Sequence, residues 1–124
     1  MEYKRVNTDF WKTIQLRCCS LEAKLIALYL LTSTHRRSEG LFRIPDFYIA
    51  GDLNLPLKVV QKSLKELEKA NFLSCDQRNN LVFIDKLLKH HLSHKQQLTA
   101  INRLHNIGKS PLFEKLFKTA RLYN

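Results

Sequence analysis

Residues 56–84 constrain the fold more than any other part of the sequence. They begin with PLKVVQKSLKELEKA, which opens on Pro56 and stops at Ala70-Asn71. Its apolar residues recur at the spacing of one helical face: Leu57, Val60, Leu64 and Leu67. Two short apolar runs follow, FLSCD and LVFI, on either side of the polar segment QRNN. The segment therefore predicts a helix followed by a β-hairpin whose turn lies at residues 77–80.

A second, more apolar helix is predicted upstream. Ser20 is a favourable N-cap for LEAKLIALYLLTST, with Glu22 in the first turn. The expected buried stripe contains Leu21, Leu25, Leu28 and Leu31, and further apolar residues widen it. A helix with apolar residues on so many sides is expected to be the central one. A short helix around Phe10 and Ile14 precedes it, and its Trp11 is interpreted as a core anchor.

The region between these helices predicts a strand and a third main helix. Leu41–Ile44 alternates like a strand, and Pro45-Asp46 then opens the helix DFYIAGDLN, with Asn54-Leu55 as the following turn. Gly51 within this helix suggests a close helix crossing. The predicted order α-α-β-α-α-β-β is that of a winged helix-turn-helix. The expected fold class is mainly α with a small β-hairpin: a winged helix-turn-helix domain at 1–84, followed by a basic helical C-terminal extension at 85–124.

The charge of the chain favours a polyanionic partner. The formal net charge is +10 among 124 residues. Residues 1–84 carry 13 Lys and Arg against 9 Asp and Glu, whereas residues 85–124 carry 8 against 2. The excess positive charge is therefore not confined to the predicted helix-turn-helix, and the extension is expected to contribute to affinity.

The helix at 57–69 carries a basic face opposite its apolar one. Its members are Lys58, Lys62, Lys65 and Lys69, with Gln61 beside them. In one interpretation this is a solvated surface whose lysines pair with Glu66 and Glu68 along the helix. In the other, Lys58, Gln61, Lys62 and Lys65 enter a DNA groove, because the N-terminal half of the second helix does so in helix-turn-helix proteins. The lysines would then contact phosphate or guanine acceptors, and Gln61 an adenine edge.

Arginines are expected to contribute outside that helix. Arg78, at or near the hairpin tip, is a candidate for a minor-groove or phosphate contact, with an ordinary turn residue as the alternative. Arg36 and Arg37 are weaker candidates for contacts to the DNA backbone. No arginine lies on the lysine-bearing helix, so bidentate guanine recognition from it is not expected. The sequence thus predicts DNA binding of modest sequence specificity.

Catalysis, metal binding and membrane insertion are not expected. The sequence contains no GxxxxGK[ST], GxSxG or GxGxxG motif, and only three glycines, so we expect neither an enzyme nor a cofactor. His90, His91 and His94 lack a third well-spaced ligand, and no metal site is expected there. Three cysteines without a CxxC spacing indicate reduced, mostly buried thiols. With no apolar membrane span and no apolar leader, a cytoplasmic location is expected.

Ordered short motifs across residues 5–117 carry a family resemblance. They are FW near the start, then LEAKLIALYLLTSTH, GLFRIPDFYIAGDLN, VVQKSLKELEKANFL, NLVFIDKLLKHH and KSPL. In this order they resemble the N-terminal domain of phage and plasmid replisome-organiser proteins, which are similar to DnaD-type primosome proteins. The resemblance implies a winged-helix domain that binds origin DNA or assembles a replisome, without catalysis. It also implies helicase-loader or initiator proteins as partners.

This sequence departs from the family's pattern at two points, and alternative functions stay open. Pro56 stands where family members often have a Ser or Thr cap, and the sequence ends at Asn124 where they often continue into a second helical domain. One alternative is a winged-helix protein-interaction module that docks another replication protein or self-assembles. The extension would supply its dimer face, with Leu112, Phe113, Leu116, Phe117 and Tyr123. Another is a transcription regulator of the same fold. A small metalloenzyme is the most distant.

Overall fold

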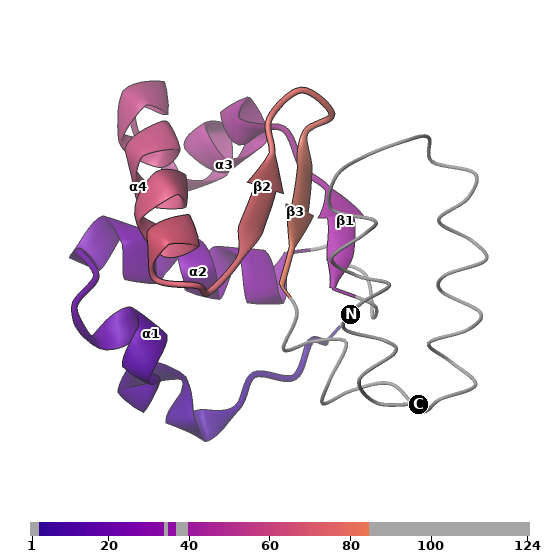
Figure 1. Cartoon of the computed structure of the whole chain (residues 1–124). Coiled ribbons are helices and arrows are strands. Elements are labelled where there is room, and N and C mark those ends of the chain that lie inside the picture. The colour runs from indigo at the N-terminus through magenta and orange to yellow at the C-terminus, as the bar shows by residue number, and fades with distance from the viewer. Residues whose placement is uncertain (1–2, 34, 37–39, 85–124) are drawn as a thin grey trace.

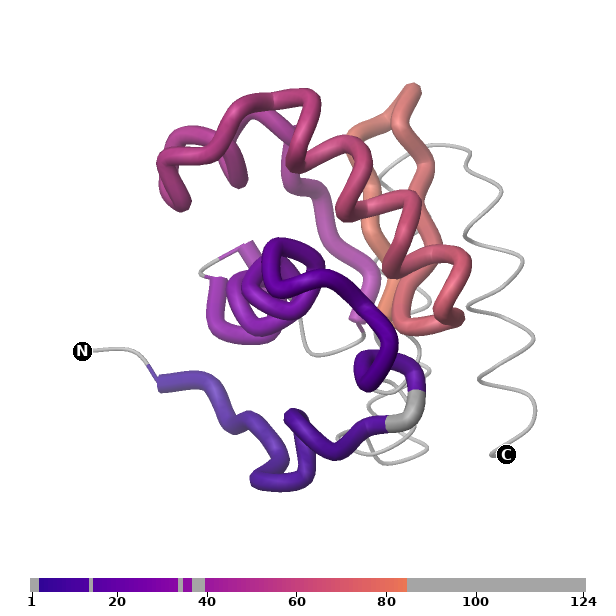
Figure 2. The backbone as a smooth tube through the Cα atoms, turned by 90° about the vertical axis from the view of Figure 1, so that its left-hand side faces the viewer, coloured from indigo at the N-terminus to yellow at the C-terminus, as the bar shows by residue number. Residues whose placement is uncertain are grey.

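Helix α2 (Leu21–Thr32) lies at the centre of the fold, with the other elements packed around it (Figures 1 and 2). The computed structural model describes residues 3–33, 35–36 and 40–84. Besides α2, these residues form a 3-10 helix, three further α-helices and three strands: η1 (Thr8–Lys12), α1 (Ile14–Arg17), β1 (Leu41–Arg43), α3 (Asp46–Leu53), α4 (Leu57–Lys69), β2 (Ser74–Asp76) and β3 (Leu81–Phe83). The expected mainly helical class with a small β element is confirmed in this part of the chain.

The buried side of α2 is not the one that its large residues predict. Ala23, Ile26, Ala27 and Leu30 have no exposed surface, whereas Leu21 is 77% exposed and Leu25 41%. The expected stripe through Leu21 and Leu25 is therefore wrong. Small alanines permit close approach of neighbouring elements, so the side of α2 that carries them packs inward. Ser20 caps the helix as expected, because its hydroxyl accepts from the N–H of Ala23.

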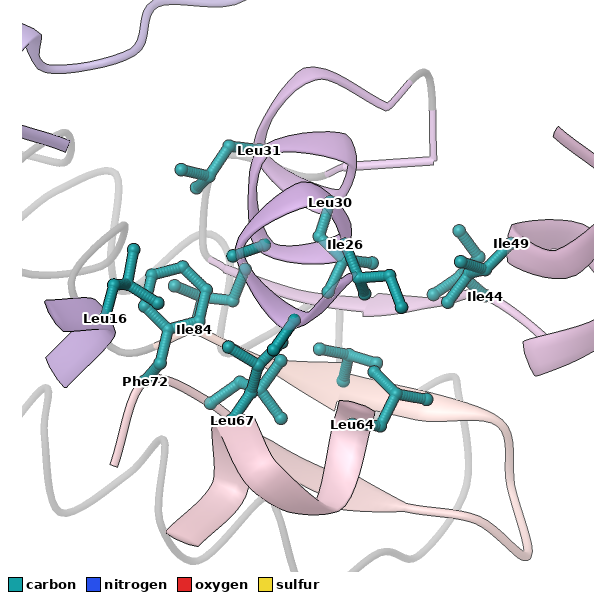
Figure 3. Packing of buried hydrophobic residues seen from close by; sticks show 14 of the residues in the cluster. Leu16, Ile26, Leu30, Leu31, Ile44, Ile49, Leu64, Leu67, Phe72 and Ile84 are labelled. Atoms are coloured by element: carbon teal, nitrogen blue, oxygen red, sulfur yellow. The ribbon is translucent and has the colours of Figure 1, made fainter. Parts of the chain in front are cut away.

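Helix α4 lies across α2 and buries the predicted face. Val60, Leu64 and Leu67 are buried, and Figure 3 shows Leu64 and Leu67 facing α2. Leu57, at the start of α4, is 43% exposed and does not join this face. Asn71, with a φ of 63°, ends the helix where the sequence indicates a stop.

Helices α3 and α4 are joined by the predicted turn. Asn54 has a φ of 56° and a ψ of 45°, a left-handed conformation that asparagine tolerates well. The N–H of the next residue, Leu55, returns to the carbonyl of Ala50 at 3.0 Å. The prediction of a close crossing at Gly51 is wrong, because a Cβ atom there would meet nothing within 4 Å.

The three strands form one antiparallel sheet with the order β1-β3-β2. Phe42 pairs with Val82, and Val82 also pairs with Cys75, so β3 is the central strand. Val82 and Phe42 belong to the main core, while Phe83, on the opposite face by strand alternation, is also buried. β2 and β3 form the predicted hairpin, and the expected extension at 85–124 lies outside the described residues.

The N-terminal segment departs from expectation in one respect. The predicted short helix is present as η1 and α1, and Asn7 caps η1. Phe10 is buried in the core, but Trp11 is 58% exposed and contacts the Phe10 ring edge-on, with centroids 4.7 Å apart. The interpretation of Trp11 as a core anchor is wrong. A 3-10 turn directs neighbouring side chains in different directions, and Phe10 takes the inward one.

Candidate nucleic-acid interface

The lysine face of α4 is exposed along its whole length. Lys58, Lys62, Lys65 and Lys69 are all exposed, while Val60, Leu64 and Leu67 anchor the opposite side in the core. Since that side is buried, the helix cannot rotate, and the lysines are held outward. Among the described residues, none of these four lysines forms an ion pair or hydrogen bond with a carboxylate. Within this part of the chain, the face therefore presents positive charge that no carboxylate compensates.

The glutamates of α4 are occupied elsewhere. Glu66 Oε2 accepts from the backbone N–H of Ser20 at 2.8 Å and from its hydroxyl at 2.9 Å. Glu68 Oε2 accepts from the backbone N–H of Cys75 at 3.0 Å, at the start of the hairpin. The interpretation in which lysines pair with Glu66 and Glu68 along the helix is therefore not what the structure shows. Both carboxylates hold neighbouring elements against α4.

Gln61 is held by the neighbouring helix. It is half-buried, and its Nε2 atom donates to Asp46 Oδ2 at 3.0 Å, which ties α4 to the first residue of α3. A glutamine amide has two N–H donors and a carbonyl oxygen, so one donor and the acceptor remain for another partner. In the free protein, Gln61 thus has a structural contact that the sequence pattern does not reveal.

Arg78 lies in the turn between β2 and β3. It is exposed, and the turn around it is braced by Asn79 Nδ2 donating to Asp76 Oδ2 at 2.8 Å. Asn80, with a φ of 55°, completes the turn and offers its carbonyl to the N–H of Ile44 at 2.8 Å. Figures 1 and 2 both place this turn at the same end of the molecule as the first turns of α4. Arg78 and the lysines at the start of α4 therefore lie at the same end of the fold.

Sequence reasoning missed two sets of residues near this end. Arg43 is exposed at the end of β1, opposite Leu81. The one sequence feature that could have marked it is a charged residue within the otherwise apolar run LFRI, before a proline. Phe47 and Tyr48, in the first turn of α3, are 61% and 48% exposed. Aromatic residues in a short helix normally indicate core, so nothing in the pattern marked them as surface.

Arg36 is not available for a partner. It is 8% exposed, and its Nη1 atom donates to the carbonyl of Leu31 at 2.7 Å and to that of Arg5 at 3.1 Å. The expectation of a DNA-backbone contact is wrong for Arg36, because its guanidinium caps the C-terminus of α2. Burial lowers the pKa of this guanidinium. Arg37 lies outside the described residues.

The cysteines are free thiols in different environments. Cys19 and Cys75 are half-buried and Cys18 is exposed, so none of the three thiols is fully buried as expected. Burial raises the pKa of Cys19, and the charge of Glu66 adds to the effect. Burial also raises the pKa of Cys75 to about 12, with a smaller contribution from Glu68. Both groups are therefore protonated at neutral pH.

The expectations about metal and membrane concern different parts of the chain. His90, His91 and His94 lie outside the described residues. Within the described ranges, no three His, Cys, Asp or Glu residues are placed to hold a metal ion. No helix in these ranges is both long enough and apolar enough to cross a membrane.

Compared with known proteins, the chain matches no family model, no curated protein and no solved structure.

Proposed function

We propose that this chain is a winged helix-turn-helix protein that binds duplex DNA through the lysine face of α4. The order α2-β1-α3-α4-β2-β3 and the sheet order β1-β3-β2 support this fold, in which α4 is the recognition helix and the β2–β3 hairpin the wing. A role in phage- or plasmid-type replication, as a replisome organiser with helicase-loader or initiator partners, is the biological setting that the motif resemblance implies. The proposal includes no catalytic step.

The observation that carries the proposal is the uncompensated lysine face. Lys58, Lys62 and Lys65 are exposed without carboxylate partners among the described residues, while the nearby glutamates are bonded elsewhere. A row of lysines on a helix that is anchored in the core matches the phosphate backbone, which is the main source of affinity in most DNA complexes. Arg78 on the wing extends the same surface.

The specificity of this surface is expected to be modest. Lysine is a point charge without the planar fork by which arginine recognises guanine. Gln61, the one side chain on this face suited to a base edge, is partly committed to Asp46. Phosphate contacts therefore dominate, and they position a protein on DNA without reading sequence.

The test is a charge reversal at the centre of the face. Lys62→Glu combined with Lys65→Glu should weaken duplex affinity by tenfold or more at moderate salt, roughly the effect of losing two phosphate contacts. The matched control is Lys12→Glu combined with Arg17→Glu, which changes the net charge equally at two exposed residues outside α4. If both pairs weaken binding equally, the effect is one of net charge, and the lysine face is not the binding surface.

A protein-interaction module is the second candidate, and one observation favours it. Leu21 and Leu25 lie one turn apart on α2 and are 77% and 41% exposed, as is common where another chain docks. Light scattering and duplex titration on the same sample separate the two functions. An oligomer that is dissociated by Leu21→Glu and has no affinity for DNA would favour the interaction module. A monomer that binds DNA would favour the lysine face.

A further inference from the structure

Three aromatic rings contact one another in series, two at the start of α3 and one, the half-buried His35, after the end of α2. The rings of Phe47 and Tyr48 are stacked, with centroids 5.1 Å apart and planes inclined by 27°. The rings of Tyr48 and His35 come next, at 5.3 Å and 53°. Phe47 is 61% exposed and Tyr48 is 48% exposed. Both rings have a large apolar area, and burying such rings normally stabilises a core. We refer to Phe47, Tyr48 and His35 as the ring ladder.

The start of α3, which carries two rings of the ladder, is bonded to α4, the helix of the lysine face. Asp46, directly before Phe47 in the chain, accepts the hydrogen bond from Gln61 of α4 at 3.0 Å. Gln61 is flanked on the same helix by Lys58 and Lys62, both exposed. The first turn of α3, which carries Phe47 and Tyr48, is therefore fixed next to exposed positive charge. The Asp46 carboxylate at this junction is already bonded to Gln61.

We propose that the ring ladder is a stacking platform for unpaired bases of a nucleic-acid strand whose phosphates contact the lysine face. The inference rests on the proposed function and specifies the nucleic acid further. Single strands are bound by positive surfaces with aromatic side chains, because every base has a π-face that can stack on a ring. Within a duplex those π-faces are covered by neighbouring bases, so the ladder selects single-stranded or locally opened DNA.

The geometry of the ladder favours stacking over general apolar docking. Phe47 is its terminal and most exposed ring, and its described ring contact is with Tyr48. The Tyr48 ring also contacts the ring of His35, whose position is set by hydrogen bonds to the hydroxyl of Ser33. The ladder is thus braced from α2 toward Phe47.

The charge beside the ladder identifies the occupant. A segment of another protein would need acidic groups to satisfy Lys58 and Lys62 and apolar groups for the rings. A nucleic-acid strand provides one phosphate and one base per nucleotide, which matches both features at once. Binding of an acidic apolar protein segment is the outcome that would contradict the inference.

The experiment compares fluorescently labelled oligothymidylate with a blunt duplex, using the full chain. Phe47→Ala and Tyr48→Ala should each weaken oligothymidylate binding by about tenfold, the typical loss for one base stack, and weaken duplex binding much less. Tyr48→Phe keeps the ring and should retain affinity. The matched control is Tyr3→Ala, which removes an aromatic ring that is 82% exposed on the N-terminal segment.

A spectroscopic variant detects stacking directly. Trp11→Phe removes the single tryptophan of the chain, and Phe47→Trp then places a lone indole at the end of the ladder. Oligothymidylate should quench its fluorescence at saturation, because a stacked base quenches an indole. Thermal unfolding of each variant checks that the fold persists.

The outcomes separate this inference from the proposed function. If the wild type binds duplex but Phe47→Ala and Tyr48→Ala leave oligothymidylate affinity unchanged, the ladder is not a stacking platform and the DNA-binding proposal stands. Equal losses for duplex and single strand also overturn the inference, because the rings would then belong to a general interface. If neither DNA form binds, both proposals fail.

Discussion

Glu66 of α4 completes the N-terminal cap of α2, because its Oε2 atom accepts from both the backbone N–H and the hydroxyl of Ser20, at 2.8 and 2.9 Å. The Ser20 hydroxyl in turn accepts from the N–H of Ala23, the third residue of the helix. In a capping box, the carboxylate comes from that third helical residue. Here it comes from a residue 46 positions away in the chain. The cap therefore also fixes α4 against the end of α2.

Removing this carboxylate should destabilise the fold. Glu66→Ala is expected to lower the free energy of unfolding by about 1–2 kcal/mol, because the backbone N–H of Ser20 loses its partner. Urea unfolding of Glu66→Ala, Ser20→Ala and the double variant measures their coupling, which should be about 1 kcal/mol. Glu22→Ala removes an exposed carboxylate from the same helix end and should show no such coupling. Strict additivity of Glu66→Ala and Ser20→Ala would contradict the shared cap.

Arg36 should be a stability residue rather than a binding residue. Arg36→Ala is expected to lower the free energy of unfolding by about 2–3 kcal/mol, because two carbonyl groups lose a charged donor. Chemical unfolding measures this loss. Arg43→Ala, at an exposed arginine, should change stability by no more than about 0.5 kcal/mol. A stable Arg36→Ala variant with weaker DNA binding would reverse the assignment.

Gly51 should be replaceable by alanine with a gain in stability. It lies within α3, a Cβ atom would meet nothing within 4 Å, and glycine favours the unfolded chain. Gly51→Ala is therefore expected to raise the free energy of unfolding by about 0.5–1 kcal/mol, measured by urea unfolding. A loss of stability would mean that a close neighbour exists at this position after all.

Local patterns in this chain predict local structure well. The spacing of Val60, Leu64 and Leu67 identifies the buried face of α4, and Ser20 identifies the start of α2, because each signal lies within a few residues. Asn71 likewise marks a helix end through its own backbone preference. The basic face follows from the same helical periodicity, so its exposure could be read from the sequence.

Contacts between distant residues were not predictable in this way. The inward side of α2 is chosen by the fit of Ala23 and Ala27 against neighbouring elements, whereas residue size favours Leu21. The bonds of Glu66 to Ser20 and of Gln61 to Asp46 join residues that no local pattern relates. The exposure of Phe47 depends on how α3 sits on the core. The sequence alone therefore predicted the exposed lysine face of α4. It predicted neither the hydrogen bonds of the glutamates to other elements nor the ring ladder.

Stability should fall at alkaline pH because of Cys75. Its pKa is raised to about 12 in the folded protein, chiefly by burial, from an ordinary value of 9.0. The folded state therefore favours the neutral thiol, and this preference is fully present below pH 9. As the pH rises from there toward 12, the unfolded chain ionises first and stability is lost. Tyr29, with a pKa raised to about 12 by burial and by Asp52, acts in the same direction above pH 10.

The alkaline effect can be assigned by substitution. Cys75→Val fills the same half-buried strand position without a titratable group, so its free energy of unfolding should decline less between pH 8 and pH 10.5. Urea unfolding across this range compares the two proteins. Equal slopes for wild type and Cys75→Val would show that the thiol does not carry the effect.

The salt dependence of duplex affinity should report how many lysines of α4 contact phosphates. Each neutralised phosphate releases counterions, so Lys58, Lys62, Lys65 and Arg78 together predict a slope of log affinity against log salt of about −3 to −4, or steeper if other basic residues contribute. Lys62→Ala should reduce the steepness by about 1, whereas Gln61→Ala should leave it unchanged. Lys12→Ala, outside α4, is the control. Fluorescence anisotropy titrations over a range of salt measure each slope. An unchanged slope for Lys62→Ala would place the phosphate contacts elsewhere on the chain.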